Sequence, residues 1–256
     1  MKTTSRFLRQ YRAEKQKLRK RYIWLCPLAF LGILFLWLLW MFRNADAHTL
    51  AQGYTSLFYQ LPMINAIMMP ILLAVIASRL CDMEIKGHTL KLLYTLQKRN
   101  SFYHCKYLFG VKYLALFIAG EFLLILLTGK LFSFTETFPV KEGLLYLLTN
   151  LVTGMILLGI QQTASLLSDN QIFPLALGLV GSFLGLFSMF FPKAVSRFIL
   201  WGYFAMFTPI GMNWDSQTRI TDYYSIPFPL TQFLLFCVFG IFLYFAGKYL
   251  FTQKEV

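Results

Sequence analysis

The chain has 256 residues, of which 57% are hydrophobic and 14% are charged, whereas a soluble domain carries about a quarter charged residues. This composition excludes an ordinary soluble enzyme and predicts an all-α, polytopic integral membrane protein. The net charge of +13 is concentrated at the N-terminus and in one internal polar segment, each beside an apolar run, so we expect membrane lipids and not nucleic acid as its counterpart.

The N-terminal segment, residues 1–22, is strongly basic and contains a single acid, Glu14. Its apolar side chains recur at spacings of four and seven residues, at Phe7, Tyr11, Leu18 and Tyr22. This pattern favours a cytosolic helix that lies in the membrane interface. A disordered basic tail that only fixes the topology is the alternative. We expect the rest of the chain, residues 23–256, to form a single transmembrane domain.

Six apolar runs are long enough to cross a hydrocarbon core of about 30 Å, which requires about 20 helical residues. They cover residues 23–42, 61–80, 107–129, 143–167, 172–191 and 230–251. The first run is longer than the apolar core of a signal peptide, which predicts a retained helix. With six spans both termini share one side, and the positive-inside rule predicts that this side is the cytosol.

Residues 81–106 form the polar segment between the second and third predicted spans. Leu92, Leu93 and Leu96 recur at the spacing of one helical face, which predicts a short amphipathic helix at the membrane surface. Gly87 precedes this helix, and we expect its backbone freedom to allow the turn from a spanning helix to one that lies flat. A helix held between two spans in this way is suited to receive a push from a soluble partner.

This segment resembles the signature after the second span of ABC-2 type transporter permeases, Glu-x-x-Gly-Thr-Leu-x-x-Leu-Leu-x-Thr-Pro-x-x-Arg, with a Lys seven residues later. The sequence departs from it at His88, which lies between the Gly and the Thr, and at Leu96, where the family has Pro. The resemblance implies a coupling helix that docks into a cleft of a separate ABC ATPase. The residues proposed for this coupling are Glu84, Gly87, Thr89, Leu92, Leu93, Leu96 and Arg99. The alternative is an ordinary basic loop, as the positive-inside rule predicts for any cytosolic segment.

Glu121 is the one carboxylate deep in a predicted span. Such residues usually face the interior of a helix bundle and often mark a transport pathway. A structural hydrogen bond to a neighbouring helix is the competing interpretation. An intramembrane enzyme that uses Glu121 with Asn150, or with Gln161 and Gln162, is a further alternative, although the spacing matches no known catalytic motif.

The fifth span contains Gly178, Gly181 and Gly185, which repeat every three or four residues and allow helices to approach closely. This stripe fits either a face for a second permease copy or packing within the same chain. Residues 198–212 are apolar but short for a span, which predicts an interfacial or re-entrant helix before the sixth span, followed by a polar outer loop.

The outer segment is rich in aromatic residues that an amphipathic substrate would meet first. The candidate contacts are Trp201, Phe207, Trp214 and Asp215. Aromatic belts occur at the interfaces of most membrane proteins, and this is the simpler explanation. The sequence has no G-x-x-x-x-G-K-[ST] phosphate loop, and its cysteines and histidines lack metal-ligand spacing. We therefore expect neither an enzyme nor a metal site in this chain.

With the resemblance, the sequence predicts a permease subunit of an ATP-driven exporter in the bacterial plasma membrane. We expect it to pair with a second permease copy or a paralogue, and ATP and Mg to bind only on the ATPase partners. The length and the outer stretch 211–215 resemble permeases of lantibiotic self-immunity systems, which implies an antimicrobial peptide as the substrate. A non-transporting membrane scaffold or sensor partner is the alternative.

Overall fold

The computed structural model describes the backbone of residues 2–87 and 89–254 and the side chains of residues 8–87, 89 and 92–254. His88 and the last two residues lie outside the described backbone, and Phe7 lies outside the described side chains. The elements, in chain order, are α1 (Lys2–Leu18), α2 (Leu25–Phe42), α3 (Ala47–Ala51), α4 (Gly53–Lys86), α5 (Leu90–Leu96), α6 (Arg99–Leu131), α7 (Val140–Leu167), α8 (Ile172–Phe187), η1 (Ser188–Phe190), α9 (Lys193–Ser196), η2 (Leu200–Gly202), α10 (Tyr203–Met206), β1 (Ile210–Trp214), β2 (Thr221–Ser225) and α11 (Leu230–Gln253).

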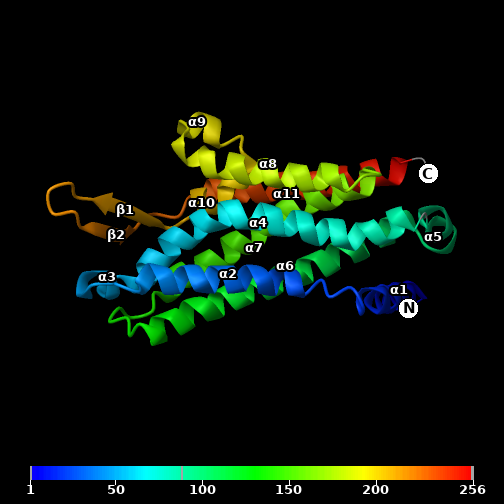
Figure 1. The fold of residues 1–256 in the computed structure, drawn as a ribbon. Helices are drawn as coiled ribbons and strands as arrows, with labels where there is room; N and C mark the ends of the chain where they lie inside the picture. The colour runs from blue at the N-terminus through cyan, green and yellow to red at the C-terminus, as the bar shows by residue number, and fades with distance from the viewer. Residues whose placement is uncertain (1, 88, 255–256) are drawn as a thin grey trace.

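Within the described chain, six helices are long and apolar enough to cross a membrane: α2, α4, α6, α7, α8 with η1, and α11. This confirms the prediction of an all-α, multi-pass membrane protein. Both described chain ends lie at one end of the bundle, beside α1 and α5, whereas α3 and the β1–β2 hairpin lie at the other end (Figure 1). Six crossings, an even number, return the chain to the side on which it began.

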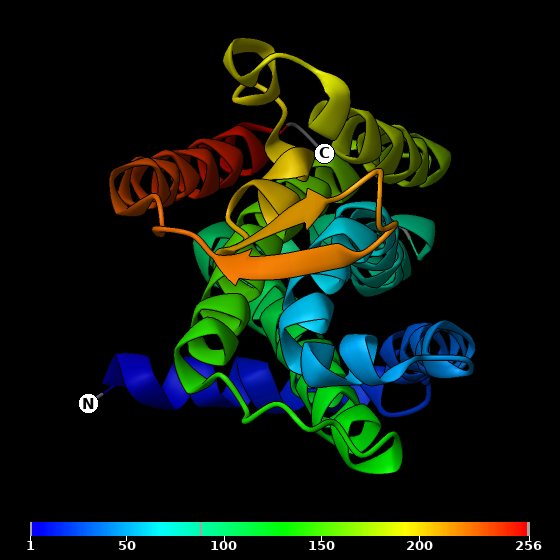
Figure 2. The ribbon, with the colours of Figure 1, turned by 90° about the vertical axis from the view of Figure 1, so that its left-hand side faces the viewer.

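Helix α4 lies at the centre of the bundle and contacts α2, α6, α7 and α8 (Figures 1 and 2). Most of its apolar window is buried, because side chains all round the helix meet other helices. Pro62 and Pro70 are buried inside α4, and the helix continues through both of them. In contrast, α2 and α11 expose most of their apolar side chains and lie at the periphery, where lipid would surround them.

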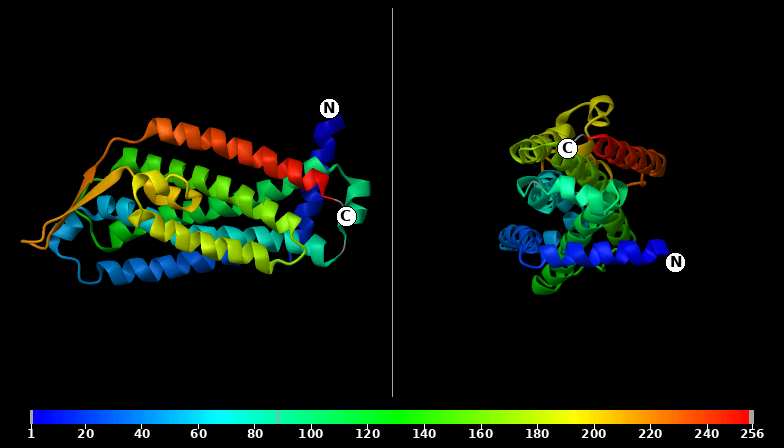
Figure 3. Two further views of the ribbon diagram at one scale, coloured as in Figure 1. Left: turned by 90° about the horizontal axis from the view of Figure 1, so that it is seen from above. Right: turned by 90° about the vertical axis from the view of Figure 1, so that its right-hand side faces the viewer.

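Helix α1 runs across the end of the bundle and not along it (Figure 3). Its Tyr11 ring stacks on Phe109 of α6 with 4.7 Å between the ring centroids, and Leu18 is buried in the same apolar cluster. Tyr22, predicted to share this stripe, follows the helix and is exposed. The basic N-terminal segment therefore forms a helix that packs on the bundle through part of the predicted stripe.

Two helices begin before the predicted spans that they contain. Helix α4 begins at Gly53, before the span predicted from residue 61, and α6 begins at Arg99, before the span predicted from residue 107. Residues 43–60, between the first two predicted spans, therefore contain α3 and two turns of α4, and only residues 87–98 separate α4 from α6. The apolar runs mark the hydrocarbon-core portion of each helix, whereas polar residues can continue the same helix into the headgroup region.

The predicted interfacial or re-entrant helix over residues 198–212 is shorter in the structure. Residues 200–206 form η2 and α10, the chain then enters β1, and the predicted polar loop after it contains β2 (Figure 2). β1 and β2 pair antiparallel, with Ile210 opposite Ser225 and Trp214 opposite Thr221. The Thr and Tyr residues of β2 favour a strand, and Arg219 adopts a positive φ of 56° in the connecting turn. The Tyr and Thr residues of this polar stretch were therefore the sequence signal for a β-strand that the prediction missed.

Candidate coupling surface and polar core

Helix α5 is the short helix predicted in the polar segment, and it lies at the end of the bundle that also holds α1 (Figure 1). Leu92 is 61% exposed and Leu96 is 74% exposed, whereas Leu93 is half-buried and packs on a cluster that includes Phe102. The three leucines therefore do not share one environment. Positions 92 and 96 are four residues apart and face outward together, and position 93 turns towards the bundle.

Gly87 and Thr89 shape the connection between α4 and α5. Gly87 has a φ of −78°, which any residue can adopt, so the expectation that glycine supplies unusual backbone freedom there is wrong. The position is instead sterically restricted, because an added Cβ would lie 2.8 Å from the carbonyl oxygen of Met83. The backbone N–H of Thr89 donates to the carbonyl of Glu84 over 3.1 Å, which holds the turn against the end of α4.

Arg99 begins α6 and ties it to the C-terminal end of α11. Its guanidinium donates to the carbonyl oxygens of Thr252 and Lys254 over 2.7 and 2.9 Å, and it lies 4.2 Å from the centroid of the Tyr94 ring. Burial outweighs the nearby guanidinium and raises the pKa of Tyr94. Arg99 therefore joins α5, α6 and α11 inside the chain.

Glu84 is buried in the last turns of α4 and pairs with Lys106 of α6 and Lys17 of α1. The Lys106 ammonium is 0% exposed and lies 2.8 Å from one Glu84 oxygen, while Lys17 lies 3.2 Å from the other. Glu14 completes the group, because it pairs with both Lys106 and Lys17. We call these four residues the ion-pair cluster. It links α1, α4 and α6 directly beneath α5.

Sequence reasoning missed Glu14 as a member of this site. Its signal was present, because Glu14 is the single acid in an otherwise basic segment of 22 residues. A buried carboxylate is stabilised by cations and hydrogen bonds, and the helical position of Glu14 turns it towards the bundle instead of solvent. Two of the residues predicted for coupling, Glu84 and Arg99, are thus internal, and Leu92 and Leu96 form the exposed surface.

Glu121 lies in the middle of the bundle and is completely buried. The amide nitrogen of Asn65, on α4, lies 3.1 Å from Glu121, 3.3 Å from the Tyr146 hydroxyl and 3.0 Å from the Asn150 side-chain oxygen, so α4, α6 and α7 meet at this group. None of these four residues lines the cavities described below. The geometry supports the structural hydrogen bond over a pathway.

The alternative catalytic partners of Glu121 also have structural contacts. Gln162 donates to the backbone carbonyl of Tyr103 over 3.0 Å, and the Asn150 amide donates to the carbonyl of Tyr146 over 2.8 Å. The Gln162 bond crosses from α7 to α6, as buried amides in membrane helices commonly do, whereas the Asn150 bond lies within α7. Among the described residues, no group of three or more His, Cys, Asp or Glu side chains is placed to hold a metal ion.

The four outer substrate candidates do not converge on one site. Trp201 packs on α8, Phe207 is buried against Phe233 and Phe236, and only Trp214, on β1, presents a largely exposed ring. Asp215 closes the hairpin turn. Its carboxylate accepts hydrogen bonds from the Gln217 backbone and the Thr218 hydroxyl, which lower the pKa of Asp215.

The three glycines of α8 are packed inside this chain. A Cβ on Gly178 would lie 2.4 Å from the Ala74 Cβ, one on Gly181 would lie 2.2 Å from the Trp201 ring nitrogen, and one on Gly185 would lie 2.7 Å from the Ala66 carbonyl. Of the two interpretations left open by the sequence, the structure uses the stripe for packing within the same chain.

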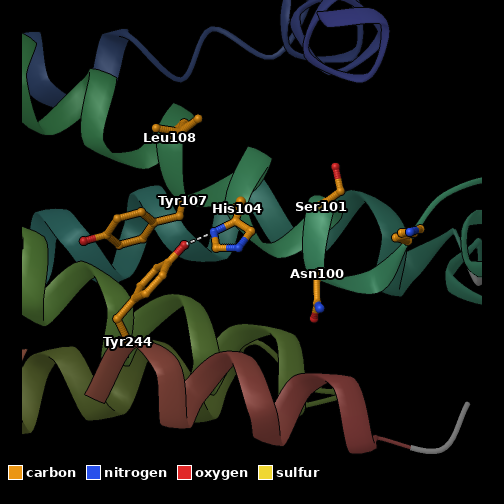
Figure 4. Close-up of a pocket in the computed structure, with 7 residues that line it drawn as sticks. Asn100, Ser101, His104, Tyr107, Leu108 and Tyr244 are labelled. Atoms are coloured by element: carbon orange, nitrogen blue, oxygen red, sulfur yellow. Dashed lines mark hydrogen bonds between the residues drawn. The ribbon is translucent and has the colours of Figure 1, made fainter. Parts of the chain in front are cut away.

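Three cavities in the described structure lie between helices or helical segments. The first, of about 510 Å³, lies between α6 and α11 near the end that holds α5, and His104 and Tyr244 hydrogen-bond across it (Figure 4). The second, of about 430 Å³, lies between the η2–α10 segment and α11 and is largely aromatic, with Arg197 and Gln232 as polar members. The third, of about 870 Å³, lies between α1 and α5.

Comparison with protein families gives one match. A model described as "ABC-2 family transporter protein" matches residues 11–185, which is more than half of the chain and extends from α1 to α8. It includes α5 and the ion-pair cluster and excludes the hairpin and α11. No curated protein and no solved structure matches the chain.

Proposed function

Because the chain belongs to the ABC-2 family of transporter proteins, we propose that it is the permease subunit of an ATP-driven exporter. The family is the membrane component of such a transporter and not its nucleotide-binding domain. A separate ABC ATPase would bind ATP and Mg, and a second permease copy or a paralogue would complete the membrane part. The bacterial plasma membrane is the proposed location.

The observation that carries this proposal is the exposed pair of leucines on α5. A short helix with outward apolar side chains, held between the two longest helices of the bundle, is suited to fill a cleft on a soluble partner. A push on α5 would reach both α4 and α6, because the ion-pair cluster joins these helices directly below it. Glu84 and Arg99 then serve coupling from inside the chain, by keeping the ends of the helices together.

The proposed substrate is an amphipathic molecule, with an antimicrobial peptide of the lantibiotic type as the specific candidate. The cavity between the η2–α10 segment and α11 supports an amphipathic substrate, because Tyr203, Phe236 and Phe239 line it and Arg197 lies beside them. Trp214 on the hairpin offers a further exposed aromatic ring at the same end of the bundle. Stimulation of ATP hydrolysis by candidate peptides in the reconstituted complex tests this part of the proposal.

The docking of α5 is tested by Leu92→Asp in the full chain co-expressed with its ATPase. Burying a leucine contributes about 1.5–3 kcal/mol, so we expect at least about a tenfold loss of affinity for the ATPase. Val140→Asp is the matched control, since Val140 is similarly exposed but lies at the first turn of α7, at the opposite end of the bundle. Equal co-purification of the ATPase with both variants would contradict the proposal.

A further inference from the structure

The cavity between α1 and α5 combines cationic, polar and apolar side chains. Its volume is about 870 Å³, and its walls come from one face of α1, from α5 and from the first turn of α6. The lining residues used below are Arg9, Gln10, Glu14, Lys17, Leu93 and Lys98. The cavity lies where α6, a candidate span, begins, which is the level at which lipid headgroups meet a spanning helix.

The polar groups of this cavity favour an anion. Arg9, Lys17 and Lys98 are basic, and Glu14 is the only acid among the lining residues that the structure describes. The charge of Glu14 is compensated within the ion-pair cluster, because Lys106 and Lys17 both pair with it. With two lysines and two glutamates, the ion-pair cluster is neutral, so the positive balance of the lining comes from Arg9 and from Lys98 at the rim.

Gln10 supplies a second, independent observation. Its side-chain oxygen accepts a hydrogen bond from the Ser101 hydroxyl, whereas its amide nitrogen is buried and has no hydrogen-bond partner among the described residues. Buried donors in native proteins are nearly always paired with protein, water or ligand. An N–H donor beside basic side chains fits an oxyanion as the acceptor.

The apolar part of the lining distinguishes a lipid from a small anion. Ala13 of α1 and Leu93 and Leu96 of α5 line the same cavity as the cations. A lipid phosphate could bind Lys98 and Gln10 while its glycerol and upper acyl carbons contact these side chains. A free phosphate would leave the apolar wall without a function, and an acidic protein segment would not require a site at the start of a span.

We propose that the cavity between α1 and α5 is a binding site for an anionic phospholipid, whose phosphate is held by Lys98, Gln10 and the basic face of α1. The site lies next to the ion-pair cluster, since Glu14 and Lys17 belong to both. A bound lipid would connect α1 to α5 at the surface. The ion-pair cluster connects α1 to α4 and α6 in the interior. The proposal does not depend on ATP hydrolysis or on the identity of the substrate.

The test is native mass spectrometry of the delipidated full chain titrated with phosphatidylglycerol, phosphatidylcholine or inorganic phosphate. We expect one phosphatidylglycerol to bind more tightly than phosphatidylcholine, and Lys98→Gln to weaken it about fivefold, as expected from about 1 kcal/mol for one basic residue near an anionic headgroup. Gln10→Leu should also weaken it. Lys193→Gln, an exposed lysine on α9 at the other end of the bundle, should leave it unchanged.

Three results would overturn the proposal. Equal binding of phosphatidylglycerol by wild type, Lys98→Gln and Gln10→Leu would show that lipid does not use this cavity. Binding of inorganic phosphate that excludes the lipid would indicate a free-anion site. Loss of ATPase binding in both variants with unchanged lipid binding would assign the cavity to an acidic protein segment. Lys98 is exposed, so Lys98→Gln keeps the test valid if Gln10→Leu fails to fold.

Discussion

Lys106 has the most constrained charge in the molecule, because it is fully buried between Glu14 and Glu84 and also donates to the carbonyl of Leu80. Removing one member of a buried ion pair leaves the other charge without compensation, at a cost of about 3–5 kcal/mol. We therefore expect Lys106→Met to lower the free energy of unfolding by about this amount. Unfolding of the purified chain in detergent micelles measures it.

The control for Lys106→Met is Lys86→Met. Lys86 pairs with Asp82 over 3.0 Å, but its side chain is 76% exposed, so solvent screens the pair and the expected loss is below about 1 kcal/mol. Similar losses for the two variants would show that the ion-pair cluster does not hold α1, α4 and α6 together. The comparison distinguishes the contribution of the buried ion-pair cluster from that of an ordinary exposed ion pair.

Glu121 is expected to be structural, and Glu121→Gln tests this. The amide has the same shape and keeps an acceptor for Asn65 and Tyr146, so we expect transport to be unchanged and the free energy of unfolding to change by less than about 1 kcal/mol. Glu121→Leu removes an acceptor from this buried group and leaves Asn65 only Tyr146 and Asn150, which should cost about 1–3 kcal/mol. Transport lost in Glu121→Gln, with stability retained, would instead place Glu121 on a pathway.

Single residues were predictable from the sequence where their chemistry conflicts with their surroundings. Glu121 was identifiable as a carboxylate in an apolar run, and its burial follows from that conflict. Its partner Asn65 lies in a different predicted span, residues 61–80. To predict that the two residues pair, one would need to know how α4 and α6 are rotated relative to each other. The helical periodicity of the sequence does not determine this rotation.

At the scale of elements, α8 is fastened to α4 through its glycines, and Gly185→Ala tests this packing. The added Cβ would meet the Ala66 carbonyl at 2.7 Å and the Trp201 carbonyl at 3.1 Å, both of them backbone atoms that move little. Overpacking of this kind costs about 1–3 kcal/mol. We expect that loss in the unfolding of the chain, with no change in its oligomeric state.

The matched control is Gly32→Ala in α2, where an added Cβ has nothing within 4 Å. Alanine favours a helix over glycine by about 1 kcal/mol, so this variant should be neutral or slightly more stable. If Gly185→Ala instead dissociated a permease dimer without destabilising the chain, the stripe would face a second copy. Unfolding and crosslinking of both variants distinguish the two results.

Element type was predicted well for the spans and poorly for the outer segment. An apolar run of 20 residues has few alternatives to a membrane helix, since the backbone must satisfy its own hydrogen bonds in lipid. Outside the hydrocarbon core this constraint disappears. Tyr223 and Tyr224 could then enter a hairpin, and α4 could begin eight residues before its apolar run.

At the scale of the whole molecule, the distribution of charge assigns a side to each end of the bundle. The end with both described termini carries the basic residues of α1 together with Lys86, Lys98, Arg99 and Lys254, whereas the hairpin end carries far fewer. The positive-inside rule therefore predicts that α1 and α5 face the cytosol and the hairpin faces outward. Docking of a cytosolic ATPase on α5 requires this orientation.

Cysteine labelling in intact cells measures the orientation directly. Gln217→Cys places a thiol in the exposed hairpin turn, and Lys20→Cys places one just after α1. The native thiols are poor competitors, because Cys81 and Cys105 are buried and Cys26 and Cys237 are only partly exposed, within membrane helices. A membrane-impermeant maleimide should label the Gln217→Cys protein in intact cells and the Lys20→Cys protein only after permeabilisation. The reverse pattern would place α5 outside the cell, out of reach of any cytosolic ATPase, and would refute the proposed coupling.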